Sequence, residues 1–338
     1  MKRVEITGTE VSRFGLQDGD LLFARRSLVF EGSGKCSLVV CPKEPTTFES
    51  SIIRARPNRS LVEPKFLYYL FASPLGRAIV ASIATRTAVS GIRGSDLVQV
   101  GLPRPPLPVQ HRIAGILSAY DDLIENNQRR IKILESMVRA LYREWFVNFR
   151  FPDHEGLPRV TSPLGEIPKG WGVKKLGEAL ELNYGKALKK EDRCDGVFPV
   201  YGSSGIVGTH NQALTKGPGI VVGRKGNIGS VFWSDEDFCV IDTAFFVTSS
   251  MPLRYLVYVL PTLNFINSDA AVPGLSRNQA YTLDILVPPD SLLEQFCELA
   301  DTFERQASTL RRQANNLRRT RDLLLPRLLS GQINVEVA

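Results

Sequence analysis

The stretch from Gln110 to Phe149 constrains the fold most, because it is typical of one long helix with a continuous apolar seam. The seam residues follow one another at alternating steps of four and three, which is the spacing of a coiled coil. They are Ile113, Leu117, Tyr120, Ile124, Asn127, Ile131, Leu134, Val138, Leu141 and Trp145. A seam of roughly 50 Å cannot be buried by one helix alone, so a partner helix is required.

The partner helix is predicted within the same chain, because the sequence repeats itself at a shift of 183 residues. The motif at 88–92 (AVSGI) falls on 271–275 (AVPGL), and the proline pair at 105–106 falls on 288–289. The shifted seam consists of Phe296, Ala300, Phe303, Ala307, Leu310, Ala314, Leu317, Arg321, Leu324 and Leu328. Because a whole domain must fit between the two helices, the sequence predicts an antiparallel intramolecular coiled coil.

Short alternating segments with glycine and proline turns precede both helices, which predicts an α+β (mixed α/β) fold with two globular domains. In the first domain we expect a helix from Pro64 and strands at Leu21–Ala24, Ser37–Cys41, Ser50–Ala55 and Leu97–Leu102. The predicted divisions are a first domain at 1–108, a central helix at 109–150, a linker at 151–172, a second domain at 173–290, a distal helix at 291–331 and a tail at 332–338.

The repeat is incomplete at its front. The best upstream match pairs residues 16–20 with 214–218, and Ala24-Arg25 with Gly223-Arg224. In that register, the equivalent of residues 165–196 has no counterpart ahead of Met1. We therefore expect the first domain to be truncated at its N-terminal side.

The composition is that of a globular protein with a modest excess of positive charge. A net charge of +7 indicates either a polyanionic partner or a solvated basic surface. The five cysteines are scattered without a CxxC pair, which argues against a zinc site or disulfide framework and for a reducing compartment. No apolar run approaches the roughly 18 residues of a membrane span, so we expect a cytoplasmic protein with no membrane partner.

The sequence contains partial matches to catalytic motifs, and each of them lacks required residues. An amino-methyltransferase needs a [DN]-P-P-[YFW] motif, but the proline pairs at 105–106 and 288–289 have other flanks. The glycine-rich residues 29–36 are similar to a phosphate loop, but Val29 replaces its first glycine and Cys36 its hydroxyl residue. Three isolated histidines form no metal constellation. We expect no catalytic, cofactor-binding or metal-binding residues in this chain.

Two globular domains followed by paired long helices resemble the specificity (S) subunit of type I restriction-modification systems. Residues 105–113 (PPLPVQHRI) are similar to the family's proline pair and EQ-x-x-I entry into the central helix, with Val109 and His111 as departures. Residues 121–127 (DDLIENN) and 140–146 (ALYREWF) resemble the continuation of its spacer. The resemblance extends over essentially the whole chain.

Residues 200–208 and 223–229 resemble motifs of the family's target recognition domains. The resemblance implies a DNA sequence-recognition subunit that reads a bipartite target in double-stranded DNA. It implies two modification (adenine methyltransferase) subunits and the restriction (endonuclease and translocase) subunits as partners. It also implies no catalysis by this chain, with S-adenosylmethionine, ATP and magnesium bound by the partners.

Candidate DNA contacts lie in and beside the glycine-rich turns of these motifs. Arginine can pair bidentately with guanine and asparagine with adenine, and a tyrosine ring can stack on a base. The candidates in the second domain are Tyr201, Ser203, Ser204, Arg224, Lys225, Asn227, Arg277 and Asn278. The matching positions of the first domain are Arg25, Arg26, Ser90 and Arg93. The alternative interpretation is a set of hairpin turns with solvated charges.

Two other function classes stay open from the residues alone. One is a stand-alone DNA-modifying enzyme, against which the missing motifs count, and the other is a coiled-coil scaffold that does not bind DNA. The residues do not determine the target sequence, the length of its gap or which contacts reach bases rather than phosphates. They also leave open whether the short first domain reads DNA and whether Asn127 sets the register of the seam.

Overall fold

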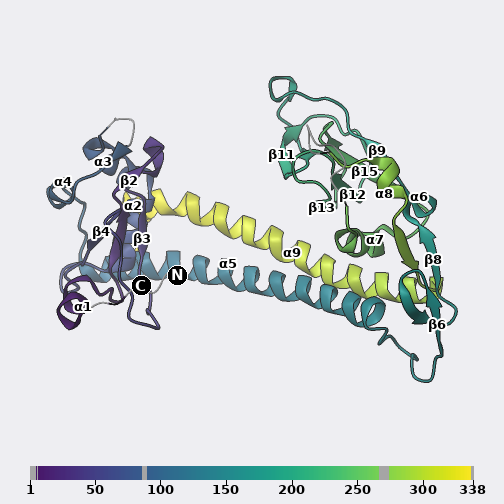
Figure 1. Ribbon diagram of the computed structural model, residues 1–338. Helices are drawn as coiled ribbons and strands as arrows, with labels where there is room; N and C mark the ends of the chain where they lie inside the picture. The colour runs from purple at the N-terminus through teal and green to yellow at the C-terminus, as the bar shows by residue number, and fades with distance from the viewer. Residues whose placement is uncertain (1–4, 6, 86–89, 266–273, 336–338) are drawn as a thin grey trace. The chain divides into compact units, whose positions relative to one another are not determined.

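The computed structural model describes residue 5 and residues 7–85, 90–265 and 274–335, and it divides into two compact units. Unit 1 contains residues 1–130 and 310–338, and unit 2 contains residues 131–309. Two long helices, α5 (Leu107–Tyr142) and α9 (Asp290–Leu329), each contribute one part to either unit (Figure 1). The mixed α+β class predicted from the sequence is confirmed.

Unit 1 is built on an antiparallel sheet of three short strands in the order β3-β1-β4. Leu21 and Phe23 lie on one face of β1 and are buried, as the two-residue period of a strand requires. Phe71 of α2 packs edge-on against Phe23, with 4.9 Å between the ring centroids. The elements ahead of α5 are α1 (Gly8–Phe14), β1 (Leu21–Ala24), β2 (Arg26–Ser27), η1 (Phe30–Gly32), β3 (Cys36–Leu38), β4 (Ile52–Ala55), α2 (Pro64–Ala72), α3 (Pro74–Ile83), β5 (Ser90–Gly91) and α4 (Gly94–Val98).

In unit 1 the first turns of α5 pack against the last turns of α9. Ile113 and Leu117 of α5 share a buried apolar cluster with Leu325 and Leu328 of α9, and α2 closes the cluster with Phe66. Because the start of one helix meets the end of the other, the two segments run antiparallel, as predicted.

A polar link joins three helices beside this cluster. The Asp121 carboxylate of α5 pairs with Arg321 of α9 and accepts a hydrogen bond of 2.6 Å from the Tyr69 hydroxyl of α2. Burial and the adjacent Asp121 carboxylate raise the pKa of Tyr69. The ion pair sets a register in which Asn127, six residues further along α5, lies about level with Ala314. The Asn127 side chain is only 9% exposed, and Ala314 is buried as well.

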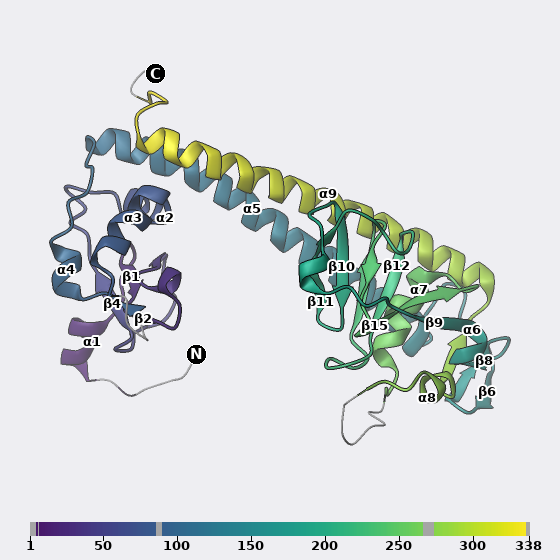
Figure 2. The same ribbon diagram turned by 90° about the horizontal axis from the view of Figure 1, so that it is seen from above.

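Unit 2 is built on a four-stranded antiparallel sheet in the order β13-β12-β15-β9, with the three-stranded sheet β11-β10-β14 beside it (Figure 2). All five residues of β12 are buried, because β13 and β15 pair with its two edges. The helix α7 lies between this sheet and α9 (Figure 1). The strands are β6 (Arg159–Ser162), β7 (Gly165–Pro168), β8 (Gly172–Lys175), β9 (Leu180–Tyr184), β10 (Phe198–Gly202), β11 (Gly205–His210), β12 (Gly219–Gly223), β13 (Val231–Ser234), β14 (Cys239–Val240), β15 (Ala244–Ser249) and β16 (Asp284–Val287). The helices are the π-helical turn η2 (Arg143–Val147), α6 (Leu176–Ala179), η3 (Lys190–Asp192), α7 (Leu253–Val259), η4 (Leu260–Thr262) and α8 (Arg277–Tyr281).

In unit 2 the end of α5 meets the start of α9 around one fully buried ring, that of Phe296. Its centroid lies 5.0 Å from that of Phe146, 6.2 Å from Trp145 and 6.3 Å from Tyr142. This contact again pairs opposite ends of the two helices, so the antiparallel direction holds in both units. Every position of the two predicted seams is buried or half-buried.

The internal repeat is visible in the backbone hydrogen bonds of the two units. Arg25 and Arg224 occupy equivalent positions in the repeat. The N–H of each arginine donates to the carbonyl of the residue just before a strand, and the carbonyl of each accepts from the N–H of an apolar residue. The partners are Ser51 (2.8 Å) and Ile92 (3.0 Å) for Arg25, and Thr243 (2.9 Å) and Leu275 (2.8 Å) for Arg224. The hydrogen bond from Tyr69 to Asp121 in unit 1 also has a counterpart in unit 2. There the Tyr258 hydroxyl of α7 donates to the Glu304 carboxylate of α9 at 3.4 Å.

The predicted strand at Leu97–Leu102 is wrong. The helix α4 ends at Val98, and no strand follows it among the described residues before α5. Its repeat counterpart, β16, is a strand because it pairs with β8. The described residues of unit 1 contain no counterpart of β8, so this segment has no partner strand. The repeated residues 88–89 and 271–273 lie outside the described part of the chain.

The segment at 151–172, predicted as a linker, contains the hairpin of β6 and β7. Phe151, Ile167 and Trp171 are buried in the core of unit 2, with the Phe151 and Trp171 rings 5.1 Å apart. These apolar side chains hold the segment against the second domain.

Gln110, in the first turn of α5, is completely buried and fastens the helix to two loops of unit 1. Its side-chain oxygen accepts from the Glu63 N–H at 2.9 Å. Its amide nitrogen donates to the carbonyls of Pro105 at 2.8 Å and Leu61 at 3.3 Å. The side chain therefore satisfies three backbone groups.

Replacing Gln110 by alanine is expected to lower the free energy of unfolding by about 1–3 kcal/mol, because these backbone groups lose their partner in a buried place. Urea denaturation of the full chain measures the change. His111→Ala is the matched control, because His111 is exposed and its 3.3 Å pair with Glu63 lies at the surface. Equal stabilities of the two variants would contradict the assigned role of Gln110.

Candidate nucleic-acid interface

An exposed aromatic ring at one end of the unit 2 sheet is in contact with two arginines. Tyr184 is the last residue of β9, and its side chain is 49% exposed. The Arg224 guanidinium lies 4.8 Å from the ring centroid and the Arg277 guanidinium lies 5.1 Å from it. We call these three residues the Arg-Tyr-Arg cluster. Guanidinium groups over aromatic faces are held by cation–π attraction and keep their N–H donors available.

Three elements that are distant in the sequence position this cluster. β9 is the edge strand of the sheet and pairs Tyr184 with Phe245 of β15. Arg224 follows β12, and backbone hydrogen bonds fasten it on both sides. Arg277 is the first residue of α8, whose N-terminus is capped by the side chain of Ser276. The neighbouring backbones therefore fix where each charge can lie.

The charge of the cluster is available to an anionic ligand. Arg224 Nη1 donates to the Asp242 carbonyl at 3.2 Å, and Arg277 also lies 5.9 Å from the Tyr281 ring. Among the described residues, neither guanidinium forms an ion pair with a carboxylate. Lys225 is half-exposed and lies 3.6 Å from Asp242, which is also exposed, so that pair is worth little.

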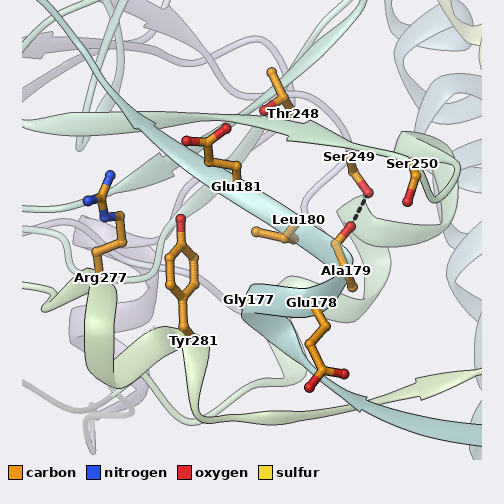
Figure 3. Close-up of a pocket in the computed structure, with 10 residues that line it drawn as sticks. All are labelled: Gly177, Glu178, Ala179, Leu180, Glu181, Thr248, Ser249, Ser250, Arg277 and Tyr281. Carbon is orange, nitrogen blue, oxygen red and sulfur yellow. Dashed lines mark hydrogen bonds between the residues drawn. The ribbon is translucent and has the colours of Figure 1, made fainter.

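A shallow polar pocket adjoins the cluster on the side of Arg277 (Figure 3). Arg277 and Tyr281 rise from α8 on one side, and Glu181 projects from β9 on the other (Figure 3). The Tyr281 hydroxyl accepts from the Leu182 N–H at 2.9 Å, which fixes α8 against the edge strand. The lining combines hydrogen-bond donors and acceptors: Glu178, Glu181, Thr248, Ser249, Ser250, Arg277 and Tyr281.

A second group of predicted residues lies where the turns after β10 and β12 meet. The Asn227 side-chain amide donates to the Ser204 hydroxyl at 3.2 Å, and both residues are exposed. Asn278 is also exposed, one residue after Arg277. The structure thus brings together turns that are more than twenty residues apart in the sequence.

Three predicted contacts belong instead to the interior. Tyr201 is buried against Phe238, with ring centroids 5.8 Å apart, so its ring is not available to stack on a base. Ser203 is buried, and its carbonyl accepts from the Ser230 hydroxyl at 2.6 Å. Ser90 is buried in β5 opposite Ser27. The glycines around Tyr201 and Ser203 suggested an open loop, but the tyrosine lies in a strand.

Unit 1 gathers three exposed arginines at the equivalent place. β2 pairs with β5, so that Arg26 lies opposite Gly91, just as Lys225 bridges Gly274 in unit 2. Arg25 and Arg93 flank this pair along the chain, and all three side chains are exposed. No counterpart of Tyr184 occurs among the described residues of unit 1, since they provide no strand equivalent to β9.

Sequence reasoning missed Tyr184. It lies on an edge strand that contains no glycine turn, and its importance comes from two arginines that are 40 and 93 residues away in the sequence. The nearest signal was its position just ahead of Gly185. A side chain at 185 would meet the Ile241 carbonyl oxygen at 2.2 Å, so glycine is needed there for close approach of the backbones.

Within the described ranges, no group of three or more His, Cys, Asp or Glu residues could hold a metal ion. No single described helix is long and apolar enough to cross a membrane, although α2 and α3, bent by 79°, pass that test together.

The sequence matches a family model described as the type I restriction modification DNA specificity domain, over residues 9–136 and 168–310. The specificity subunit of the type I restriction enzyme MjaIX from Methanocaldococcus jannaschii is 23% identical over 343 residues, which cover 93% of this chain and 79% of the relative. The EcoKI specificity subunit of Escherichia coli is 32% identical over 127 residues, 36% of this chain and 27% of the relative. Among solved structures, the S subunit from M. genitalium has the same fold, with a TM-score of 0.61 and 19% identity over 94% of this chain and 84% of that one.

Proposed function

This chain belongs to the family of type I restriction-modification DNA specificity domains, and we propose that its unit 2 contacts duplex DNA through the Arg-Tyr-Arg cluster. The chain is a sequence-recognition subunit without catalysis of its own. Its task is therefore to bind one DNA sequence more tightly than others, and the side chains that do so must be exposed and positioned before DNA arrives.

The observation that carries the proposal is the exposed Tyr184 ring with two guanidiniums at about 5 Å from its centroid. Arginine is the commonest reader of guanine, because its planar fork matches the O6 and N7 acceptors of that base. The ring holds each fork in place, so less conformational entropy is lost on binding. An exposed aromatic ring can also pack on sugar or base surfaces.

Unit 1 supports the same use of its matching surface. Arg25 and Arg26 follow the central strand as Arg224 and Lys225 do in unit 2, and Arg93 is the N-cap residue of α4, two residues after β5. We propose that this surface reads the second half of a bipartite target. Two similar surfaces on one chain suit two half-sites of different sequence, because their side chains differ while their backbones correspond.

The modification and restriction subunits of a type I system are the partners of this chain. We propose two modification subunits, seated along the helices, and we assign S-adenosylmethionine, ATP and magnesium to the partners. Each unit's part of α5 exposes two large apolar side chains, which suits one docking place in each unit. They are Ile116 and Leu123 in unit 1, and Ile133 and Met137 in unit 2.

Selection of bound duplexes from a random library tests the function. The full chain, assembled with its modification subunits, is expected to enrich one bipartite sequence with a fixed gap at a stated salt concentration. Modification subunits without this chain provide the control. Failure to enrich any sequence would overturn DNA reading and leave the scaffold function in its place.

A further inference from the structure

The tip of one loop in unit 1 exposes two aliphatic side chains beside the arginines. Leu28 is 87% exposed and Val29 is 60% exposed, and they directly follow β2, which contains Arg26. Leu28 is the most exposed large apolar side chain among the described residues. Single exposed apolar residues are common on proteins, so the exposure of this pair does not by itself mark a binding site.

The loop from Leu28 to Gly34 has a fixed shape. The Val29 N–H donates to the Ser27 hydroxyl at 3.2 Å, and the Gly32 N–H donates to the Val29 carbonyl at 3.1 Å. Arg77 Nη2 donates to the carbonyls of Glu31 at 2.8 Å and Ser33 at 3.1 Å. Four hydrogen bonds therefore hold a backbone whose outermost side chain makes little contact with the protein.

Glycine lets the base of this loop lie against the core. Gly34 has a φ of +64°, and a Cβ there would come within 2.2 Å of the Val80 side chain. Val80 is completely buried. The loop is thus anchored in the interior at one end and in β2 at the other, and its tip is directed outward.

The tip exists only in unit 1. In unit 2 the Gly229 N–H donates to the Gly223 carbonyl at 2.9 Å, and in unit 1 the Gly34 N–H donates to the Ala24 carbonyl at 2.7 Å. Between these equivalent bonds lie nine residues in unit 1 and five in unit 2. The longer insert adds Leu28 and Val29 shortly after Arg26, whose equivalent in unit 2 is Lys225.

We propose that Leu28 contacts the C5-methyl group of a thymine in the half-site that unit 1 reads. The inference rests on the proposed function. Arg25, Arg26 and Arg93 are exposed around the β2–β5 pair and would draw the phosphate backbone to this surface. The thymine methyl is the apolar group that the major groove presents, so it is the natural partner of an aliphatic tip. Insertion between bases would instead require unstacking, which is costly.

The exposed carboxylate of Glu31, in the same loop, restricts how the tip can approach DNA. Phosphates are repelled by this charge, so the tip can enter only with Glu31 turned toward the groove or toward solvent. A glutamate in the groove can accept from cytosine N4. The loop therefore favours base edges over phosphates.

The test replaces each thymine of the unit 1 half-site in turn by uracil, which lacks the methyl group. The protein is the full chain with its modification subunits. Wild-type binding is expected to weaken roughly four-fold at one thymine, the effect of about one buried methyl group. Leu28→Ser is expected to weaken binding to thymine DNA by about 3- to 10-fold, and to respond equally to thymine and uracil at that position.

Val40→Ser is the matched control, because Val40 is 61% exposed and follows β3 at the other end of the β1–β3 hairpin. It is expected to bind like wild type and to keep the preference for thymine. A Leu28→Ser complex that retains the thymine preference would overturn the methyl contact. So would a rise in 2-aminopurine fluorescence at a base step on binding, because that would show insertion between bases. Neither result would affect the enrichment of a bipartite sequence, so failure of this inference is distinguishable from failure of DNA reading.

Discussion

Replacing Arg224 and Arg277 together by alanine is expected to weaken specific DNA binding on the order of 100-fold at constant salt. Each arginine that pairs bidentately with a base contributes about 1–3 kcal/mol of discrimination. Both guanidiniums contact the Tyr184 ring. Removing one arginine therefore also loosens the side chain that positions the other arginine. Titration of the selected duplex with the assembled complex measures the loss.

Arg159→Ala is the control for this result. Arg159 is an exposed arginine of unit 2, and it also lies over an aromatic ring, 5.5 Å from the Phe149 centroid. It belongs to β6 and not to the Arg-Tyr-Arg cluster, so its removal is expected to change affinity less than three-fold, roughly the effect of a weak surface contact. Equal losses for Arg159 and for the cluster would show that only general charge matters.

The salt dependence of the same titrations separates base contacts from phosphate contacts. Each phosphate contact that is lost lowers the slope of log K against log salt by about 0.9. If Arg224 and Arg277 reach bases, the slope stays near that of wild type while the preference for the selected sequence declines. A slope reduced by nearly two, with the preference intact, would reassign both arginines to phosphates.

Replacing Phe296 by alanine is expected to lower the free energy of unfolding of unit 2 by about 3–5 kcal/mol, as for other fully buried phenylalanines. The ring touches α5, η2 and α7 at once, so its loss leaves a cavity that several helices line. Thermal or urea denaturation followed by tryptophan fluorescence measures it, because Trp145 is one of the neighbours.

Leu299→Ala is the control for Phe296. Leu299 lies on the same helix but is 42% exposed, so little apolar surface is lost with it. Its expected effect is below about 1 kcal/mol. A similar destabilisation by both variants would mean that α9 contributes through helix propensity and not through packing against the end of α5.

The long helices and their pairing could be predicted because a seam is a local pattern. Steps of four and three place Ile113 and Leu117 on one face whatever the rest of the chain does, and the repeat gave the partner at a constant shift. The strand expected at Leu97–Leu102 failed for a non-local reason. Pairing with β8 makes β16 a strand, and the segment in unit 1 lacks such a partner.

The candidate DNA contacts divide in the same way between local and non-local signals. Arg224 and Arg277 lie beside glycine turns, so sequence reasoning found them. Tyr184 became a candidate only when β9 had been placed at the edge of the sheet between them. For Tyr201 the error was one of burial, because glycine neighbours are shared by open loops and by strand ends that pack closely.

The matching hydrogen bonds at Ala24–Gly34 and Gly223–Gly229 have a consequence for how such a protein can change. Each hydrogen bond joins the two residues that flank a short insert, and the two inserts differ in length by four residues. A mutation or length change between the two bonded residues alters the exposed surface of the insert and leaves the hydrogen bonds at its base in place. Under the proposed function, the chain would acquire new target sequences by changes within these two inserts, without a new fold.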